Sequence, residues 1–201
     1  MPEVGAALSC VRVFAKQGRA AIHTRPSNFD VILNVIAFQA AWLALVVGAA
    51  NGFALVGLAV TFGAIALHLV RSPRAGPEAT LLLAATAVGL LIESAILATG
   101  LVSYAAPAPV SWLPPAWLVM LWPAFATLLN VTFRPFRDWT LMAVAFGFVL
   151  VPFAYYAGAM LGAMSMPEPA LRTLLLIGIA WAAALPLLLA LARRWDGWRV
   201  A

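Results

Sequence analysis

The chain has 201 residues, of which 65% are hydrophobic and only 9% are charged. A soluble domain usually has about a quarter of its residues charged, and one of this length could not bury so much apolar surface. The 12 basic and 7 acidic residues give a net charge of +5. Because the basic residues flank apolar runs, they indicate membrane topology and contacts with lipid headgroups, not nucleic-acid binding. We therefore expect an integral membrane protein whose partners are membrane lipids.

Residues 1–30 form a basic leader before the first apolar run. Its basic residues are Arg12, Lys16, Arg19 and Arg25. A helix over 4–19 would be amphipathic and could lie on the membrane surface, and a flexible cytoplasmic segment is the alternative. The single cysteine, Cys10, excludes an internal disulfide framework, and no long apolar stretch precedes it as in a signal peptide.

Six apolar runs follow the leader, and each is close to the roughly 20 residues that a helix needs to cross a bilayer. They cover residues 31–50, 52–70, 79–102, 114–133, 139–163 and 171–192. The connections are too short to fold as soluble domains. The sequence thus predicts an all-α membrane protein, with a six-transmembrane-helix bundle over residues 31–193 and a short cytoplasmic tail over 194–201.

The distribution of basic residues predicts the orientation. With the N-terminus in the cytoplasm, 11 of the 12 basic residues lie on the cytoplasmic side, and only Arg172 lies outside. Cytoplasmic loops are enriched in Lys and Arg. We therefore expect a multi-pass protein of the bacterial inner membrane with both termini in the cytoplasm.

Two ionisable residues fall within the apolar runs. Glu93 lies roughly 20 Å from the cytoplasmic end of the third run, where a carboxylate must be protonated, face a wet cavity or pair within the bundle. It could accept protons, contact a cationic or hydroxylated ligand, or simply hydrogen-bond a neighbouring helix. His68 lies near the cytoplasmic end of the second run and could be a proton relay, a phosphate contact or an ordinary interfacial histidine.

Polar side chains in other runs are further candidates for a cavity. Asn34 and Asn130 are expected at about the depth of His68, and Gln39 lies farther along the first run. Such amides could line a cytoplasm-facing pocket or hydrogen-bond between helices. In the fifth run Pro152 precedes Tyr155 and Tyr156, and a proline that frees a backbone carbonyl often borders a cavity or produces a plain kink.

Motifs for common membrane chemistry are missing from the sequence. It has no GxSxG, HExxH, CxxC or phosphate-binding loop, and its two histidines cannot build a histidine-rich di-iron site. The one lysine, Lys16, lies in the leader, which excludes a retinal Schiff base in the bundle. We therefore expect no metal and no cofactor, and we lean towards a protein that is not an enzyme.

A set of spaced residues resembles a bacterial membrane family catalogued as domain of unknown function 2878. The resemblance rests on Asn34 to Trp42, on His68 and Glu93, on Trp117, Trp122 and Asn130, and on Pro152, Tyr155, Tyr156, Trp181 and Pro186. It covers about residues 30–193 and leaves the basic leader outside. The resemblance implies no established activity, and the occurrence of family members beside lipid-modifying enzymes favours a lipid-related role.

Three hypotheses remain open from the sequence. The first is an accessory protein that binds a lipid or small hydrophobic ligand between its helices. The second is a small proton-coupled transporter that uses Glu93, and the third is a lipid-modifying enzyme with Glu93 and His68 as acid–base groups. If the helices are straight, Glu93 and His68 differ in depth by more than about 10 Å, which argues against one shared active site.

The orientation can be tested with reporter fusions. Fusions after Val102 and Met164 should report the outer side of the membrane, and fusions after Arg74 and Arg137 should report the cytoplasm. Alkaline phosphatase and green fluorescent protein reporters give opposite readouts for the two sides. One exchanged pair of results would contradict the topology.

Overall fold

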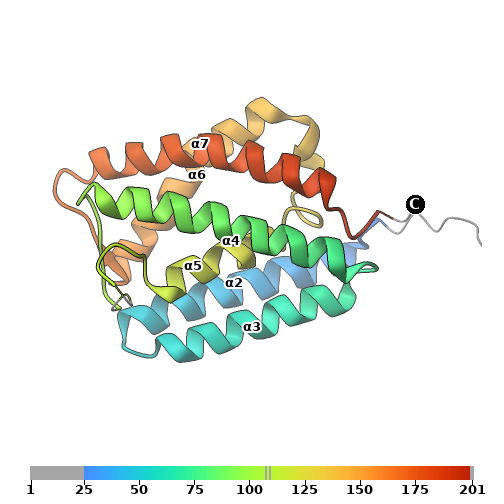
Figure 1. Cartoon of the computed structure of the whole chain (residues 1–201), viewed down its shortest axis with the longest axis horizontal. Helices are drawn as coiled ribbons and strands as arrows, with labels where there is room; N and C mark the ends of the chain where they lie inside the picture. Colours follow the sequence, from blue (N-terminus) through green and yellow to red (C-terminus); the bar gives the residue numbers. More distant parts are fainter. Residues whose placement is uncertain (1–24, 107, 109, 200–201) are drawn as a thin grey trace, which may run out of the picture.

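The computed structural model describes residues 25–106, 108 and 110–199 (Figure 1). Its elements are α2 (Asn28–Ala50), α3 (Ala54–Arg71), α4 (Ala75–Ala98), β1 (Ser103–Tyr104), α5 (Ala116–Ala126), the 3-10 helix η1 (Arg134–Asp138), α6 (Thr140–Met160), β2 (Met164–Ser165) and α7 (Leu171–Arg194). The predicted surface helix over 4–19 and Cys10 lie outside the described residues. The fold is thus helical, as the sequence predicts.

Five helices are long and apolar enough to cross a membrane: α2, α3, α4, α6 and α7. Their bounds agree with five of the six predicted runs to within four residues. The start of α2 is set by a capping box, because the Ser27 hydroxyl accepts a hydrogen bond from the Asp30 amide while the Asp30 carboxylate accepts one from the Ser27 amide. At the other end of α2, Asn51 and Gly52 form the turn into α3, and Gly52 has a φ of 79°.

The fourth predicted run differs from the structure. Instead of one helix over 114–133, the chain forms the eleven-residue α5 and then turns through residues 127–133. The Thr127 hydroxyl bonds back to the Ala124 carbonyl, and the Thr127 carbonyl accepts from the side chain of Asn34 on α2. Non-helical backbone at membrane depth is tolerated where protein covers it, and residues 127–131 are all buried.

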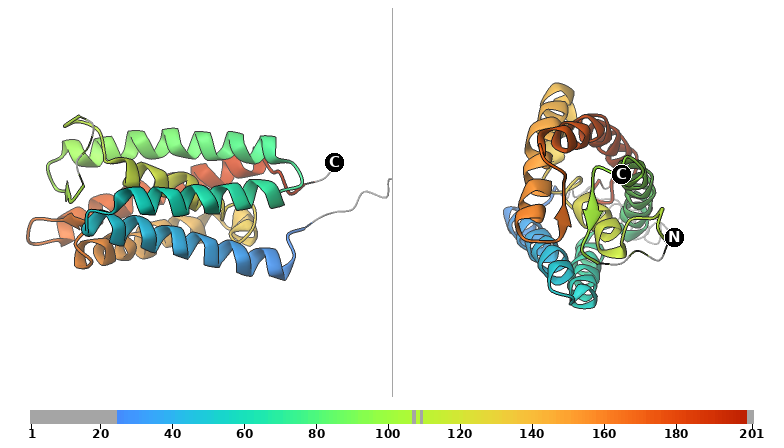
Figure 2. Two further views of the ribbon diagram at one scale, coloured as in Figure 1. Left: turned by 90° about the horizontal axis from the view of Figure 1, so that it is seen from below. Right: turned by 90° about the vertical axis from the view of Figure 1, so that its left-hand side faces the viewer.

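The long helices surround α5. In the end-on view α2 and α3 lie at one side, α4 and α7 at another, and α6 completes the ring (Figure 2). Most of α5 is buried as a result, including Trp117, Trp122 and Phe125. At one end of the bundle β1 and β2 pair antiparallel, with Ser103 opposite Ser165. The arrangement places a short aromatic helix along the middle of the protein.

The close contact between α4 and α5 depends on Gly89. A Cβ atom built at Gly89 would lie 2.1 Å from Cγ of Trp122, so only glycine leaves room for this indole. Glu93 is one helical turn further along α4, and its Oε1 accepts a hydrogen bond from Trp122 Nε1 at 3.1 Å. Gly89 therefore fixes the distance at which Trp122 meets Glu93.

Gly89→Ala should destabilise the protein by about 1–3 kcal/mol, because the added methyl group overpacks the contact and displaces Trp122. The matched control is Gly63→Ala in α3, where a Cβ would have nothing within 4 Å; this change should be neutral or slightly stabilising because alanine favours helix. Thermal unfolding in detergent measures both. Equal melting temperatures for the two variants would contradict this account of the α4–α5 contact.

Candidate functional site

A cavity of about 450 Å³ lies beside α5. Its walls come from α2, α5, α6 and the turn after α5, with Trp181 contributed by α7. The aromatic side chains that line it are Phe38, Trp42, Trp117, Trp122, Phe125, Phe133, Phe146, Tyr155 and Trp181. Most of the other lining residues are aliphatic, and Gln39 and Thr132 are the polar ones among them. A volume and lining of this kind are typical of small-molecule sites, which are mostly apolar with few polar groups.

The cavity opens at the side of the bundle between α2 and α6. Several residues that line it are also exposed on the surface of these two helices: Val35 and Gln39 on α2, and Leu150 and Ala154 on α6. The same faces of α2 and α6 carry apolar side chains over the length that would lie in a bilayer. A molecule dissolved in the membrane would therefore reach the cavity sideways, without passing through water.

Glu93 is fully buried behind the cavity wall, where three neutral groups donate hydrogen bonds to its carboxylate. Tyr155 and Trp122 both donate to Oε1, and the Tyr104 hydroxyl donates to Oε2 at 3.4 Å. Tyr155 and Trp122 also line the cavity, so each joins the carboxylate to the cavity surface. In β1, burial and the neighbouring Glu93 carboxylate raise the pKa of Tyr104, so its hydroxyl remains a donor.

The tryptophans next to Glu93 are held by mutual stacking. The indoles of Trp122 and Trp181 are stacked with centroids 4.4 Å apart, and Phe125 packs edge-on against Trp181 at 5.2 Å. Trp181 Nε1 donates to the Tyr155 hydroxyl at 3.3 Å. A continuous chain of contacts thus runs from α7 through Tyr155 to the carboxylate on α4.

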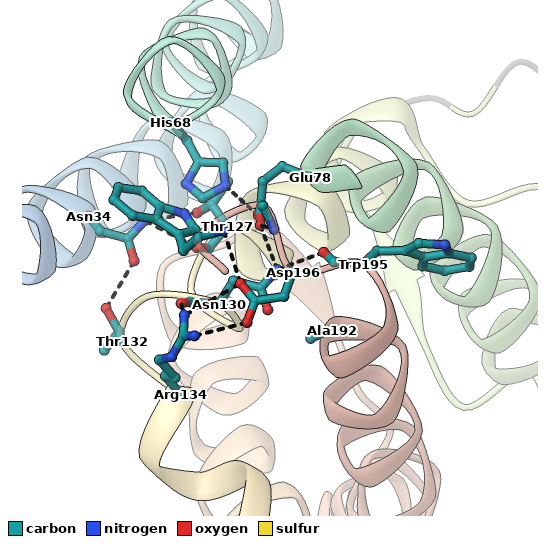
Figure 3. Close-up of polar contacts among 12 residues, drawn as sticks. Asn34, His68, Glu78, Thr127, Asn130, Thr132, Arg134, Ala192, Trp195 and Asp196 are labelled. Carbon is teal, nitrogen blue, oxygen red and sulfur yellow. Dashed lines mark hydrogen bonds and ion pairs between the residues drawn. The ribbon is translucent and has the colours of Figure 1, made fainter. Parts of the chain in front are cut away.

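A second polar cluster lies at one end of the bundle (Figure 3). We call this the basic end, because it contains Arg71, Arg74, Arg134 and Arg137. His68 Nε2 is 2.9 Å from Oε2 of Glu78, and both side chains are buried. Oε1 of Glu78 accepts from Asn130 Nδ2 at 2.6 Å and from the Gly197 amide at 2.7 Å. A buried carboxylate needs such partners, since an unpaired charge in this position would cost several kcal/mol.

The segment Trp195–Trp198 after α7 completes this cluster. The Asp196 carboxylate pairs with Arg134 at 3.0 Å and Arg137 at 2.9 Å, and Arg137 also donates to the side-chain oxygen of Asn130. Burial lowers the pKa of Arg137, while the hydrogen bond and charge of Asp196 act in the opposite direction. Arg74 holds the segment from α4 through the Asp196 carbonyl at 2.7 Å. We call this segment the C-terminal clasp.

The remaining predicted site residues have different positions. Asn34 bonds to the Thr127 carbonyl and accepts from Thr132, and so joins α2 to the turn after α5. Gln39 lies at the mouth of the cavity. Tyr156, in contrast to Tyr155, is 45% exposed on α6 and does not line the cavity. The structure therefore brings Tyr155 and Gln39 to the cavity, whereas Asn34 does not line it.

Glu93 and His68 belong to separate clusters with no common hydrogen-bond partner among the described residues. A shared acid–base site for the two is therefore not formed. Sequence reasoning did not single out Glu78, Tyr104, Arg137 or Asp196 as site residues, because each lies near the predicted end of an apolar run, where polar residues are ordinary. Their pairing depends on contacts between distant segments, such as Glu78 with Gly197.

A family model described as "Protein of unknown function (DUF2878)" matches residues 31–187. The chain belongs to this family. The matched part contains the whole cavity wall, Glu93 with its three donors, and the His68–Glu78 pair, but it ends before the C-terminal clasp. Neither the curated proteins nor the solved structures gave a match.

Asn130→Ala should lower the free energy of unfolding by about 1–3 kcal/mol, because it leaves Glu78 and Arg137 each without one buried partner. Gln39→Ala removes a comparable amide from an exposed position and should cost less than about 0.5 kcal/mol. Thermal shift assays on both purified variants measure the difference. Similar melting temperatures would show that the amide of Asn130 does not support the cluster at the basic end.

Proposed function

We propose that the protein binds a lipid or another small hydrophobic ligand in the cavity between α2, α5 and α6. The main support for this proposal is the cavity itself, because it is apolar, lies within the bundle and opens towards the side that lipid would cover. In a bilayer, empty apolar space of this size would fill with lipid chains or with a dedicated ligand. The protein thus holds a membrane-soluble molecule against α5.

The proposal includes the place of the protein in the cell. It is a multi-pass protein of the bacterial inner membrane with both termini in the cytoplasm, and α5 with the turn after it forms the fourth of six crossings. The end that contains Arg71, Arg74, Arg134, Arg137 and the last turn of α7 faces the cytoplasm, in agreement with the positive-inside rule. The β1–β2 pair then lies at the outer surface.

Binding is favoured over transport or catalysis by the arrangement at the two ends of the bundle. The C-terminal clasp ties together α4, η1 and α7 at the basic end, and none of its residues lines the cavity. The cavity opens laterally, between α2 and α6. His68, which the enzyme hypothesis pairs with Glu93, instead contacts Glu78 in the separate cluster at the basic end.

Ala154→Phe should reduce ligand occupancy about tenfold, because the new ring occupies the mouth of the cavity and an overpacked contact costs about 1–3 kcal/mol. Met160→Phe on the same helix is the control, since Met160 is 72% exposed and does not line the cavity. Native mass spectrometry after gentle extraction measures the co-purified ligand. Equal occupancy in both variants, or a ligand-free wild-type protein, would contradict the proposal.

A further inference from the structure

The acidic residues of the described chain differ in whether a basic side chain lies close to them. Asp30, Glu78, Asp138 and Asp196 each lie within 4 Å of an arginine or a histidine. Glu168 has no such partner and is exposed to solvent. Within residues 25–106, 108 and 110–199, Glu93 is therefore the buried acid that lacks a basic partner.

The hydrogen bonds to Glu93 do not neutralise it. Tyr104, Trp122 and Tyr155 orient and solvate the carboxylate, but all three are uncharged donors. In a low-dielectric interior the field of a carboxylate extends well beyond its hydrogen-bonded neighbours. A cation in the cavity, on the other side of Tyr155 and Trp122, would lie within that field and would favour the ionised form of Glu93.

The cavity wall next to Glu93 suits a positive charge for a second, independent reason. The faces of aromatic rings attract cations, and the attraction is strongest for tryptophan and for a site shielded from water. Trp122 and Trp181 cover one face of each other by stacking, but the lining holds nine aromatic side chains in all, including Tyr155 and Phe125 beside this pair. No lysine, arginine or histidine lines the cavity in the part of the chain that the structure describes.

We infer that the ligand of this cavity is a lipophilic cation, an amphiphile whose ammonium or similar group lies against Trp122, Trp181 and Tyr155 with Glu93 as the counter-charge. This inference rests on the proposed function and adds the charge of the ligand to it. The apolar part of the molecule extends along the aliphatic walls of α2 and α6 towards the lateral opening. An anionic amphiphile would meet the field of Glu93 with no basic group to offset it.

Three probes with the same alkyl chain test the inference: dodecyltrimethylammonium, dodecanol and dodecanoate. Isothermal titration calorimetry of the full chain in an uncharged detergent should give the tightest binding for the ammonium, with dodecanol at least about tenfold weaker and dodecanoate weaker still. Ala154→Phe should weaken the binding of all three probes about tenfold, whereas partition into the micelle would be unchanged by the variant.

Two charge-removing variants complete the experiment. Glu93→Gln should weaken the ammonium at least about tenfold and leave dodecanol unchanged, whereas Glu168→Gln removes the same charge from an exposed position and should change neither. If Glu93→Gln does not fold, the wild-type order of the three probes decides alone. Equal binding of the ammonium and dodecanol to the wild type would contradict a cationic ligand but not ligand binding in the cavity. No binding of any probe would contradict both the cationic ligand and the proposed binding function.

Discussion

Polar groups inside a membrane protein must find their partners within the protein, because the surrounding hydrocarbon offers none. This constraint organises both ends of the bundle. At the basic end, Glu78 is matched by His68, Asn130 and the Gly197 amide. At the other end, Glu93 receives three neutral donors from three different segments. Each carboxylate therefore fixes the relative positions of helices that apolar contacts alone would hold less specifically.

The short α5 and the turn after it contribute to both the cavity and the polar cluster at the basic end. After α5 ends at Ala126, the chain turns towards the basic end, where Asn130 joins the polar cluster. The aromatic residues of α5 then form one wall of the cavity and leave the opposite side to α2 and α6.

Much of this fold follows from the sequence, since apolar runs predict the five long helices and Glu93 is recognisable as a buried acid by its position in such a run. The family resemblance is confirmed by the match over residues 31–187. The end of α5 at Ala126 was not predictable, because residues 127–133 continue the apolar run and their turns depend on contacts with distant residues such as Asn34 and Glu78. For the same reason sequence could not place Tyr155 in the cavity and Tyr156 on the surface.

The C-terminal clasp has a consequence for biogenesis. Its residues follow every described helix in the chain, so Glu78, Arg137 and Asn130 are synthesised well before Asp196 and Gly197. Until then the basic end holds a carboxylate and a guanidinium without their final partners. A chain cut off before Trp195 would keep every described helix but would leave Glu78, Arg134 and Arg137 permanently without these partners, so its unsatisfied polar groups would mark it as incomplete.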